Sequence, residues 1–235
     1  MSNPLQDLRV AVTGGTSGLG LALVRALHAQ GARVAFVARD AGRVQRVAAE
    51  LAGTHGIVGD IASKTDTHRI ALQINAALGG LDVLVNNASS LGPVPLALLA
   101  DTECEELGAA LAANLVGPFR LTKALLGSLT ASARERRTRT EERAAIVVNI
   151  SSDAAVTPYA GWGAYGASKA ALLHLSRIWS EELAEHGVHV VSFDPGDMDT
   201  PLHSLAVPDA DPASLKRPAD SARELLARIT AEVAA

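Results

Sequence analysis

Short runs of β-branched and apolar residues alternate along the chain with longer segments rich in Ala and Leu. The short runs predict six strands, at residues 9–14, 33–39, 56–60, 81–87, 144–151 and 188–195. Most of these runs are continuously apolar, which is typical of parallel strands that are covered on both faces. The segments between them are long enough for crossover helices. The pattern therefore predicts right-handed βαβ units and an α/β fold with a doubly wound parallel sheet.

The segment after the first predicted strand shows the helical pattern most clearly. Gly31 follows it, at a position where helices commonly end. A last helix is expected to begin near Pro218, and no strand pattern follows it. The polar stretch 132–144 interrupts the rhythm, and we expect it to extend a helix into solvent and return as a loop. Apolar side chains recur in the first helix at intervals of three and four residues, at Leu19, Ala22, Leu23, Ala26 and Leu27.

Composition narrows the class of protein. Hydrophobic residues make up 48% and charged residues 20% of the 235 positions, which suits one globular domain over residues 1–235. A net charge of −4 argues against nucleic acid or an anionic membrane as the partner. Cys104 is the only cysteine, and neither a signal peptide nor a bilayer-spanning stretch is evident. We expect a soluble cytoplasmic protein, and the seven histidines suggest no metal site.

Three of the glycines in the stretch TGGTSGLG (residues 13–20), which joins the first strand to the first helix, fall at positions 14, 18 and 20. A helix N-terminus at this place offers free N–H groups and the positive end of the helix dipole to an anion. Without a Cβ at Gly14, Gly18 and Gly20, a pyrophosphate can approach the backbone. A dinucleotide is the expected ligand, and a tight turn without a ligand is the alternative.

The glycine spacing resembles that of the short-chain dehydrogenase/reductase family, in its compact one-domain branch. Further motifs follow in the family's order: NNAS (86–89) with Ser89 in place of a glycine, Asn114 in AANLVG, NISS (149–152), YGASK (165–169) and DPGDMDT (194–200). The resemblance covers about residues 8 to 230. It implies a Rossmann-type sheet and an NADP(H)-dependent oxidoreductase that acts on a carbonyl or a secondary alcohol. Members of this branch usually have a seventh strand, for which this chain shows no pattern.

The resemblance implies a catalytic set of Asn114, Ser152, Tyr165 and Lys169. Tyr165 and Lys169 are four residues apart, so they share one helix face. The lysine ammonium and an oxidised nicotinamide are expected to lower the tyrosine pKa, ordinarily about 10, so that Tyr165 exchanges a proton with the substrate oxygen. Ser152 would orient that oxygen, with Ser151 as the alternative. Asn114 resembles the family residue that holds a water in a relay to the lysine.

The resemblance also implies which residues hold the cofactor. Arg39 follows the position where NAD-dependent relatives carry an acidic residue, and a guanidinium there suits the 2′-phosphate of NADP. Asp40 is the alternative, because a shift of one residue would make it a ribose ligand and favour NAD(H). Asp60 would contact the adenine. The expected contacts are Gly14, Thr16, Ser17, Gly18, Leu19, Gly20, Arg39, Asp60, Ile61, Asn87, Ala88, Ser89, Tyr165, Lys169, Pro195, Gly196, Met198 and Thr200.

Substrate, assembly and activity are less specified. Ser152, Tyr159, Trp162 and Tyr165 are expected to contact a small carbonyl or alcohol, whose identity the sequence does not give. Asp197 and Asp199 are expected to cap a helix, with recognition of a cationic substrate as the alternative. The helices that carry Asn114 and Tyr165 are rich in Ala and Leu, and such helices pack across a two-fold axis in the family, so we expect a homodimer or homotetramer. A non-catalytic NADP(H) sensor is the competing interpretation. A sugar-nucleotide epimerase fits poorly, because those relatives are longer.

Overall fold

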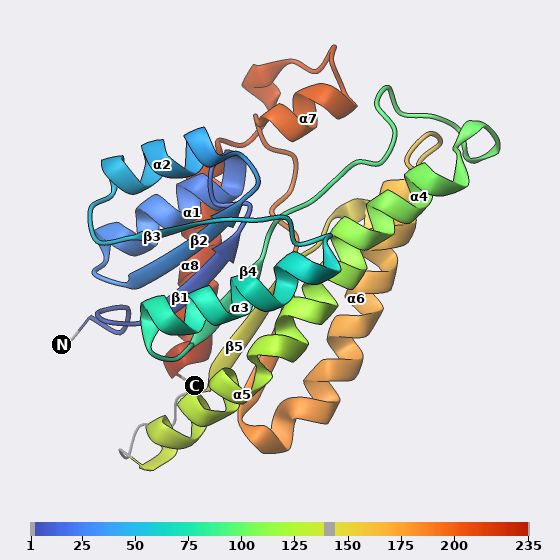
Figure 1. Ribbon diagram of the computed structural model, residues 1–235. Coiled ribbons are helices and arrows are strands. Elements are labelled where there is room, and N and C mark those ends of the chain that lie inside the picture. The colour runs from blue at the N-terminus through green and yellow to red at the C-terminus, as the bar shows by residue number, and fades with distance from the viewer. Residues whose placement is uncertain (1–2, 139–143, 235) are drawn as a thin grey trace.

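The computed structural model describes residues 3–138 and 144–234. Six parallel strands form one sheet in the order β3-β2-β1-β4-β5-β6 (Figure 1). The predicted doubly wound parallel sheet is confirmed, and each strand ends one or two residues before its predicted limit. The strands are β1 (Arg9–Thr13), β2 (Arg33–Ala38), β3 (His55–Val58), β4 (Val83–Asn86), β5 (Ala145–Ile150) and β6 (Val188–Phe193).

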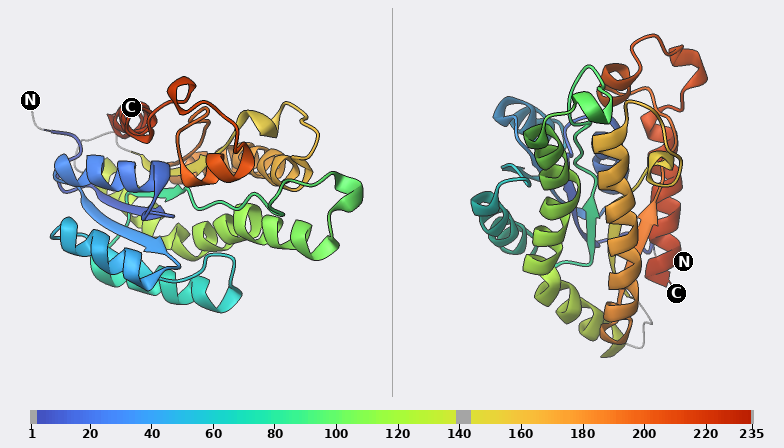
Figure 2. Two further views of the ribbon diagram at one scale, coloured as in Figure 1. Left: turned by 90° about the horizontal axis from the view of Figure 1, so that it is seen from above. Right: turned by 90° about the vertical axis from the view of Figure 1, so that its right-hand side faces the viewer.

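Helices cover both faces of the sheet. One face carries α1 (Gly18–Ala29), α2 (Ala41–Glu50) and α8 (Pro218–Ala234). The other carries α3 (Lys64–Leu78), α5 (Gly117–Thr138) and α6 (Gly163–Leu183), and the right-hand view of Figure 2 shows α5 and α6 side by side. Two further helices, α4 (Cys104–Leu111) and α7 (Pro201–Ala206), lie near one end of the sheet. Within the described residues the sheet ends at β6, and α8 is the last element, as predicted.

Two hydrophobic cores explain why the strands are continuously apolar. Side chains alternate across a strand, so neighbours on β1 belong to different cores. Val10 and Val12 pack toward α1 and α8, whereas Ala11, between them, packs toward α3 and α5. All three are fully buried. Since neither face of the sheet meets water, the strand sequences do not alternate between apolar and polar residues.

The parallel arrangement brings the carboxyl ends of all six strands to one edge of the sheet. The loops after β1, β4, β5 and β6 therefore meet there, and α7 lies at the same end as the loop before α4 (Figures 1 and 2). The strand order reverses between β1 and β4, where open α/β sheets bind ligands.

No helix among residues 3–138 and 144–234 has the length and apolar character to cross a bilayer.

The polar stretch 132–144 behaves only in part as predicted. It does extend a helix, since α5 runs to Thr138. The prediction of a solvated surface is wrong at its start, because Ser132 and Ala133 are buried. The Ser132 hydroxyl donates to Asp82, whose carboxylate also pairs with the Arg9 guanidinium at 2.8 Å. The expected return loop falls largely on residues 139–143, outside the described residues.

Candidate active site

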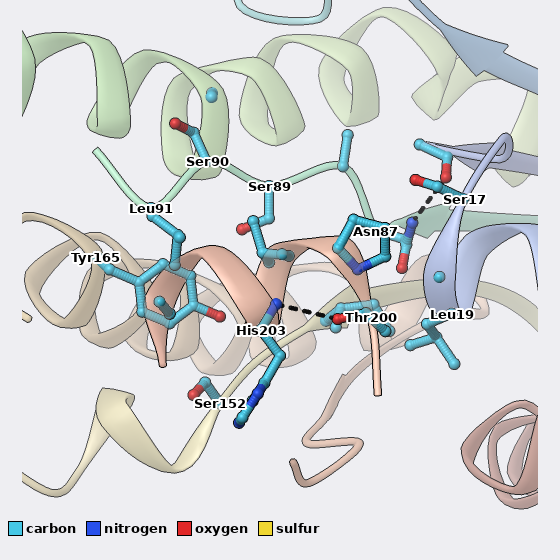
Figure 3. Close-up of a pocket in the computed structure, with 18 of the residues that line it drawn as sticks. Ser17, Leu19, Asn87, Ser89, Ser90, Leu91, Ser152, Tyr165, Thr200 and His203 are labelled. Carbon is cyan, nitrogen blue, oxygen red and sulfur yellow. Dashed lines mark hydrogen bonds between the residues drawn. The ribbon is translucent and has the colours of Figure 1, made fainter. Parts of the chain in front are cut away.

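A cavity of about 930 Å³ runs along the carboxyl edge of the sheet. One end is bounded by the glycine turn after β1 and by the start of α2. The other end is bounded by the loops before α4 and after β5 and by α7. Figure 3 shows side chains from these separate elements facing a shared space. The motifs that are scattered along the sequence thus meet at the switch point of the sheet.

The glycine turn needs glycine for two reasons. Gly14 and Gly18 have φ angles of +69° and +50°, which other residues rarely adopt. A Cβ at Gly14 would also lie 2.8 Å from the Asn87 side chain. Gly20 differs, because it does not line the cavity: a Cβ there would collide with the Gly14 carbonyl oxygen. Gly20 therefore lets α1 pack against the turn.

The start of α1 is available to an anion. Ser17 occupies the N-cap position of α1, but its side chain makes no capping hydrogen bond. The first N–H groups of a helix have no partner within the helix, so they and the Ser17 hydroxyl can hold a phosphate group. Thr16, Ser17, Gly18 and Leu19 all line the cavity. This cradle fits a dinucleotide pyrophosphate.

Tyr165 and Lys169 lie one helical turn apart on α6, at the base of the other half of the cavity. Tyr165 is 8% exposed and Lys169 is 2% exposed. The lysine Nζ donates a hydrogen bond to the Ile150 carbonyl oxygen at 2.8 Å, and it lies 5.5 Å from the centre of the tyrosine ring. The carbonyl at the end of β5 thus fixes the ammonium beneath the ring, as the predicted shared helix face requires.

Burial shifts the pKa values of these two groups in opposite directions. Desolvation raises the pKa of Tyr165 above its usual value, and a hydrogen bond from the Ser152 side chain offsets this only in part. Desolvation also lowers the pKa of Lys169 to about 8, against a smaller opposing effect of the Asp194 carboxylate. The predicted lowering of the tyrosine pKa is thus not found in the protein without cofactor. Desolvation of the phenolate outweighs the hydrogen bonds from Ser152 and Ser89, which lower the Tyr165 pKa.

Of the two candidate serines after β5, Ser152 and not Ser151 hydrogen-bonds to Tyr165, and Ser89 from the loop after β4 does so as well. The Ser152 hydroxyl is among the groups that shift the tyrosine pKa, and Ser151 is not. Ser152 also N-caps the short turn Asp153–Ala155, with Oγ accepting from the Ala154 N–H at 3.2 Å. Both serines line the cavity. In Figure 3 the Ser152 and Tyr165 side chains lie at the same end of the cavity.

Asn114 is fully buried and does not line the cavity. It lies in the π-helical turn Ala112–Val116 between α4 and α5. Its Nδ2 donates to the Ser90 carbonyl oxygen and the Ser168 hydroxyl, while its Oδ1 accepts from the Ser90 N–H and the Ser89 hydroxyl. These four bonds use the whole capacity of the side chain. Asn114 therefore fixes the loop after β4. The water relay from Asn114 to Lys169 stays a prediction. Such a relay would have to use the backbone carbonyl of Asn114, because its side chain has no free donor or acceptor.

Arg39 and Asp40, at the far end of the cavity, differ in the contacts that their side chains make. Arg39 is exposed on the cavity wall, and no ion pair engages it within the described residues. Asp40 N-caps α2 instead: its side chain accepts from the Arg43 N–H at 2.9 Å, and this bond lowers the Asp40 pKa. The Asp40 carboxylate is 3.6 Å from the Arg43 guanidinium. Arg43 also lines the cavity, and sequence reasoning missed it.

The structure brings nearly all the predicted site residues together. Gly20 and Asn114 alone among them are set back from the cavity wall. The predicted capping by Asp197 or Asp199 is wrong, because Thr200 caps α7 by accepting from the His203 N–H at 3.2 Å. The predicted residues on the wall are Gly14, Thr16, Ser17, Gly18, Leu19, Arg39, Asp60, Ile61, Asn87, Ala88, Ser89, Ser152, Tyr159, Trp162, Tyr165, Lys169, Pro195, Gly196, Met198 and Thr200.

Sequence reasoning also missed several residues at the Tyr165 end of the cavity. Asp153 accepts a hydrogen bond from the Tyr159 hydroxyl at 2.7 Å, and His203 projects from α7. Ser90, Leu91 and Leu202 line the same end. Their contribution follows from loop packing, for which the sequence carries no periodic signal. In the described part of the chain, no group of three or more His, Cys, Asp or Glu side chains is arranged to hold a metal.

Comparison with known proteins shows that both the sequence and the fold of this chain are similar to those of short-chain dehydrogenases. The family model described as short chain dehydrogenase matches residues 9–210. Mouse L-fucose dehydrogenase is 32% identical over 204 residues, covering 86% of this chain and 70% of that protein. Serine 3-dehydrogenase of Agrobacterium fabrum is 33% identical over 193 residues, covering 81% and 72%. A short-chain dehydrogenase structure from Shigella flexneri, complexed with NADP, superimposes with a TM-score of 0.84 at 26% identity, covering 94% and 90% of the two chains.

The buried lysine predicts a stability that depends on pH. A lysine pKa lowered from 10.5 to about 8 means that folding penalises the charged form. The penalty is full below pH 8 and disappears as the pH rises through 10.5. Using about 1.4 kcal/mol per pKa unit, we expect Lys169 to contribute about 2 kcal/mol more to stability at pH 9.5 than at pH 7.

Urea unfolding of the wild type and of Lys169→Met at both pH values measures this contribution. Between pH 7 and pH 9.5 the free energy of unfolding should rise by about 2 kcal/mol more in the wild type than in the variant. Lys123→Met, at an exposed position of α5, controls for the loss of a lysine. Equal pH dependence of the wild type and Lys169→Met would show that burial of Lys169 carries no such cost.

Proposed function

The chain belongs to the short-chain dehydrogenase family, and on that premise we propose that it transfers hydride between NADP(H) and a carbonyl compound or secondary alcohol. The observation that carries the proposal is the joint presence of Tyr165, Lys169 and Ser152 in a cavity that also holds the glycine turn. An NAD(H)-dependent alcohol dehydrogenase is the second candidate. A non-catalytic sensor would need the glycine turn but not a proton-transfer set.

The chain's own residues supply proton transfer and orientation. The cofactor, when bound, supplies or accepts the hydride. Because burial raises the Tyr165 pKa, the phenol is protonated at neutral pH and can donate to a carbonyl oxygen during reduction. The Ser152 hydroxyl orients that oxygen. The Lys169 ammonium, fixed by the Ile150 carbonyl, stabilises the phenolate that forms. Alcohol oxidation runs the same steps in reverse and is favoured by higher pH.

Cofactor preference is proposed from the charges at the far end of the cavity. Arg39 and Arg43 are the guanidinium groups on the wall within the described residues, and both suit a 2′-phosphate. Asp40 is engaged in capping α2, which argues against its use as a ribose ligand. The Shigella flexneri relative was solved with NADP. These observations favour NADP(H) over NAD(H).

Assembly through α5 and α6 is also proposed. Phe119 of α5 and Trp179 of α6 stack with ring centres 5.3 Å apart. Ile178, which precedes Trp179 in the chain, is 42% exposed. Helix faces of this kind suit an isologous contact, so we expect a homodimer, with a tetramer as the alternative. Light scattering at micromolar concentration measures the mass, and a monomer would contradict the proposal.

Removing the Tyr165 hydroxyl tests the catalytic assignment. Tyr165→Phe keeps the ring and loses the proton donor, so carbonyl reduction should fall by roughly 10²- to 10⁴-fold in kcat. NADPH affinity, measured by fluorescence titration, should stay near the wild-type value. Tyr159→Phe, at the other tyrosine of the chain, loses one hydrogen bond to Asp153 and should fall by under about tenfold. Near-wild-type kcat in Tyr165→Phe would refute the role of Tyr165.

Two variants separate the candidate cofactors. If Arg39 binds the 2′-phosphate, a charge-assisted bond of about 1.5–3 kcal/mol gives a roughly 10- to 150-fold preference for NADPH in kcat/KM. Arg39→Ala should remove most of that preference by weakening NADPH, with NADH nearly unchanged. Asp40→Asn keeps a capping side chain and removes the charge, so it should change the ratio little. An NADH-preferring wild type whose NADPH use improves in Asp40→Asn would instead assign the ribose to Asp40.

A further inference from the structure

Exposed apolar side chains gather around the Tyr165 end of the cavity. Ten large apolar side chains are exposed among the described residues, and seven of them lie in three segments near this end. Three of the seven, Tyr159, Leu205 and Val207, line the cavity itself. We name these seven the apolar rim: Val94, Leu98 and Leu99 before α4, Val156 and Tyr159 after β5, and Leu205 and Val207 at the end of α7. The concentration at one end of the molecule makes a random scatter of surface apolar residues a poor explanation.

The rim continues inward into an apolar wall around Tyr165. A third hydrophobic cluster, separate from the two cores of the sheet, contains Tyr165 with Leu91 and Ala154. Leu96, Trp162, Leu202 and Ala206 pack against it. Apart from Tyr165 on α6, the members come from the segments that carry the rim: the loop before α4, the loop after β5, and α7. The cluster covers no face of the sheet, so its apolar character serves the cavity.

The rim loops are packed against each other and against α6. The Leu99 side chain lies so close to Gly163, at the start of α6, that a Cβ there would collide with it. The rings of Trp162 and Tyr165 are 5.7 Å apart and meet edge to face. A rim held in this way offers a fixed apolar surface to a ligand in the cavity, at little cost in ordering.

Charges near the rim are negative. Asp153 and Asp197 lie on the wall at this end. The Arg and Lys side chains on the described wall are Arg39 and Arg43, at the far end, and Lys169, which is buried beneath Tyr165. An anionic group on the outer part of a substrate would therefore meet carboxylates and no exposed cation.

We propose that the substrate is a ketone or secondary alcohol on an extended, uncharged apolar scaffold, whose tail lies on the apolar rim while its oxygen meets Tyr165 and Ser152. The reacting end of this proposal rests on the proposed function. Burial of an apolar tail against the rim stabilises the complex in proportion to the area removed from water. Sugars and amino acids, the substrates named for the mouse and Agrobacterium relatives, offer no such tail.

A series of 2-alkanones from butan-2-one to decan-2-one tests the proposal, with kcat/KM measured at saturating NADPH. Each methylene that the rim buries should raise kcat/KM by about three- to fourfold until the tail extends past the rim. The matched acid 9-oxodecanoate carries the same methyl ketone with a carboxylate at the tail end, and it should be at least about tenfold poorer than decan-2-one. A flat series, or a preference for polyols, would overturn the proposal.

Rim variants connect the effect to the named residues. In the double variant Leu205→Ser and Val207→Ser, the rise of kcat/KM with chain length should flatten. Leu72→Ser, at a position 71% exposed on α3 and away from the cavity, should keep the wild-type slope. If the double variant changes the mass in light scattering and leaves the slope intact, the rim is an interface between copies of the chain and the proposal is wrong.

A binding measurement tests the proposed substrate class separately from the proposed hydride transfer. If no carbonyl is reduced with either cofactor, the proposed function fails. Calorimetric titration of 2-alkanols from butan-2-ol to decan-2-ol into the protein saturated with NADP⁺ then tests the rim without turnover. Affinity should rise with chain length in the wild type and in Leu72→Ser, and less so in the double variant. Equal affinity along the series would overturn the proposal independently of catalysis.

Discussion

The buried hydroxyl of Thr13 ties the two halves of the sheet together where the ligand cavity begins. Its Oγ1 accepts from the N–H groups of Asn87 and Ala88, each at 3.0 Å, and the Asn87 side chain donates to the Thr13 carbonyl oxygen at 2.8 Å. Figure 3 shows Asn87 beside the glycine turn. Thr13 is fully buried, so each of these groups would be costly to leave unpaired. These hydrogen bonds fix the turn after β1 relative to the loop after β4, and the positions of both cavity walls depend on them.

Burial at the Tyr165 end works against the ionised forms of both titratable groups. It raises the Tyr165 pKa and lowers the Lys169 pKa, because neither charge is well solvated there. A protonated phenol at neutral pH suits proton donation, and a lysine with a pKa of about 8 is expensive for the fold. The same desolvation that makes the site chemically useful therefore costs stability, which the two well-packed cores of the sheet must offset.

The two ends of the cavity differ in how they are built. The glycine-turn end has free backbone N–H groups, with the charged side chains of Arg39, Asp40, Arg43 and Asp60 on its wall. The Tyr165 end is built from apolar loops with carboxylates at the border. One elongated cavity thus combines two chemically different ends, which suit the proposed anionic dinucleotide and the proposed uncharged substrate, within a single described sheet.

The sequence alone determined what depends on local pattern. Six apolar runs predicted the strands, because a parallel sheet buries both faces, and the glycines at 14 and 18 marked the turn, because its φ angles and close approaches exclude other residues. The four-residue spacing of Tyr165 and Lys169 predicted their shared face, because residues four apart lie one above the other on an α-helix. Tertiary structure alone decided the direction of the Tyr165 pKa, the engagement of Asp40 with α2, the full bonding of Asn114 and the gathering of the apolar rim. Each of these depends on desolvation or on contacts between segments far apart in the chain, and no local periodicity encodes such contacts.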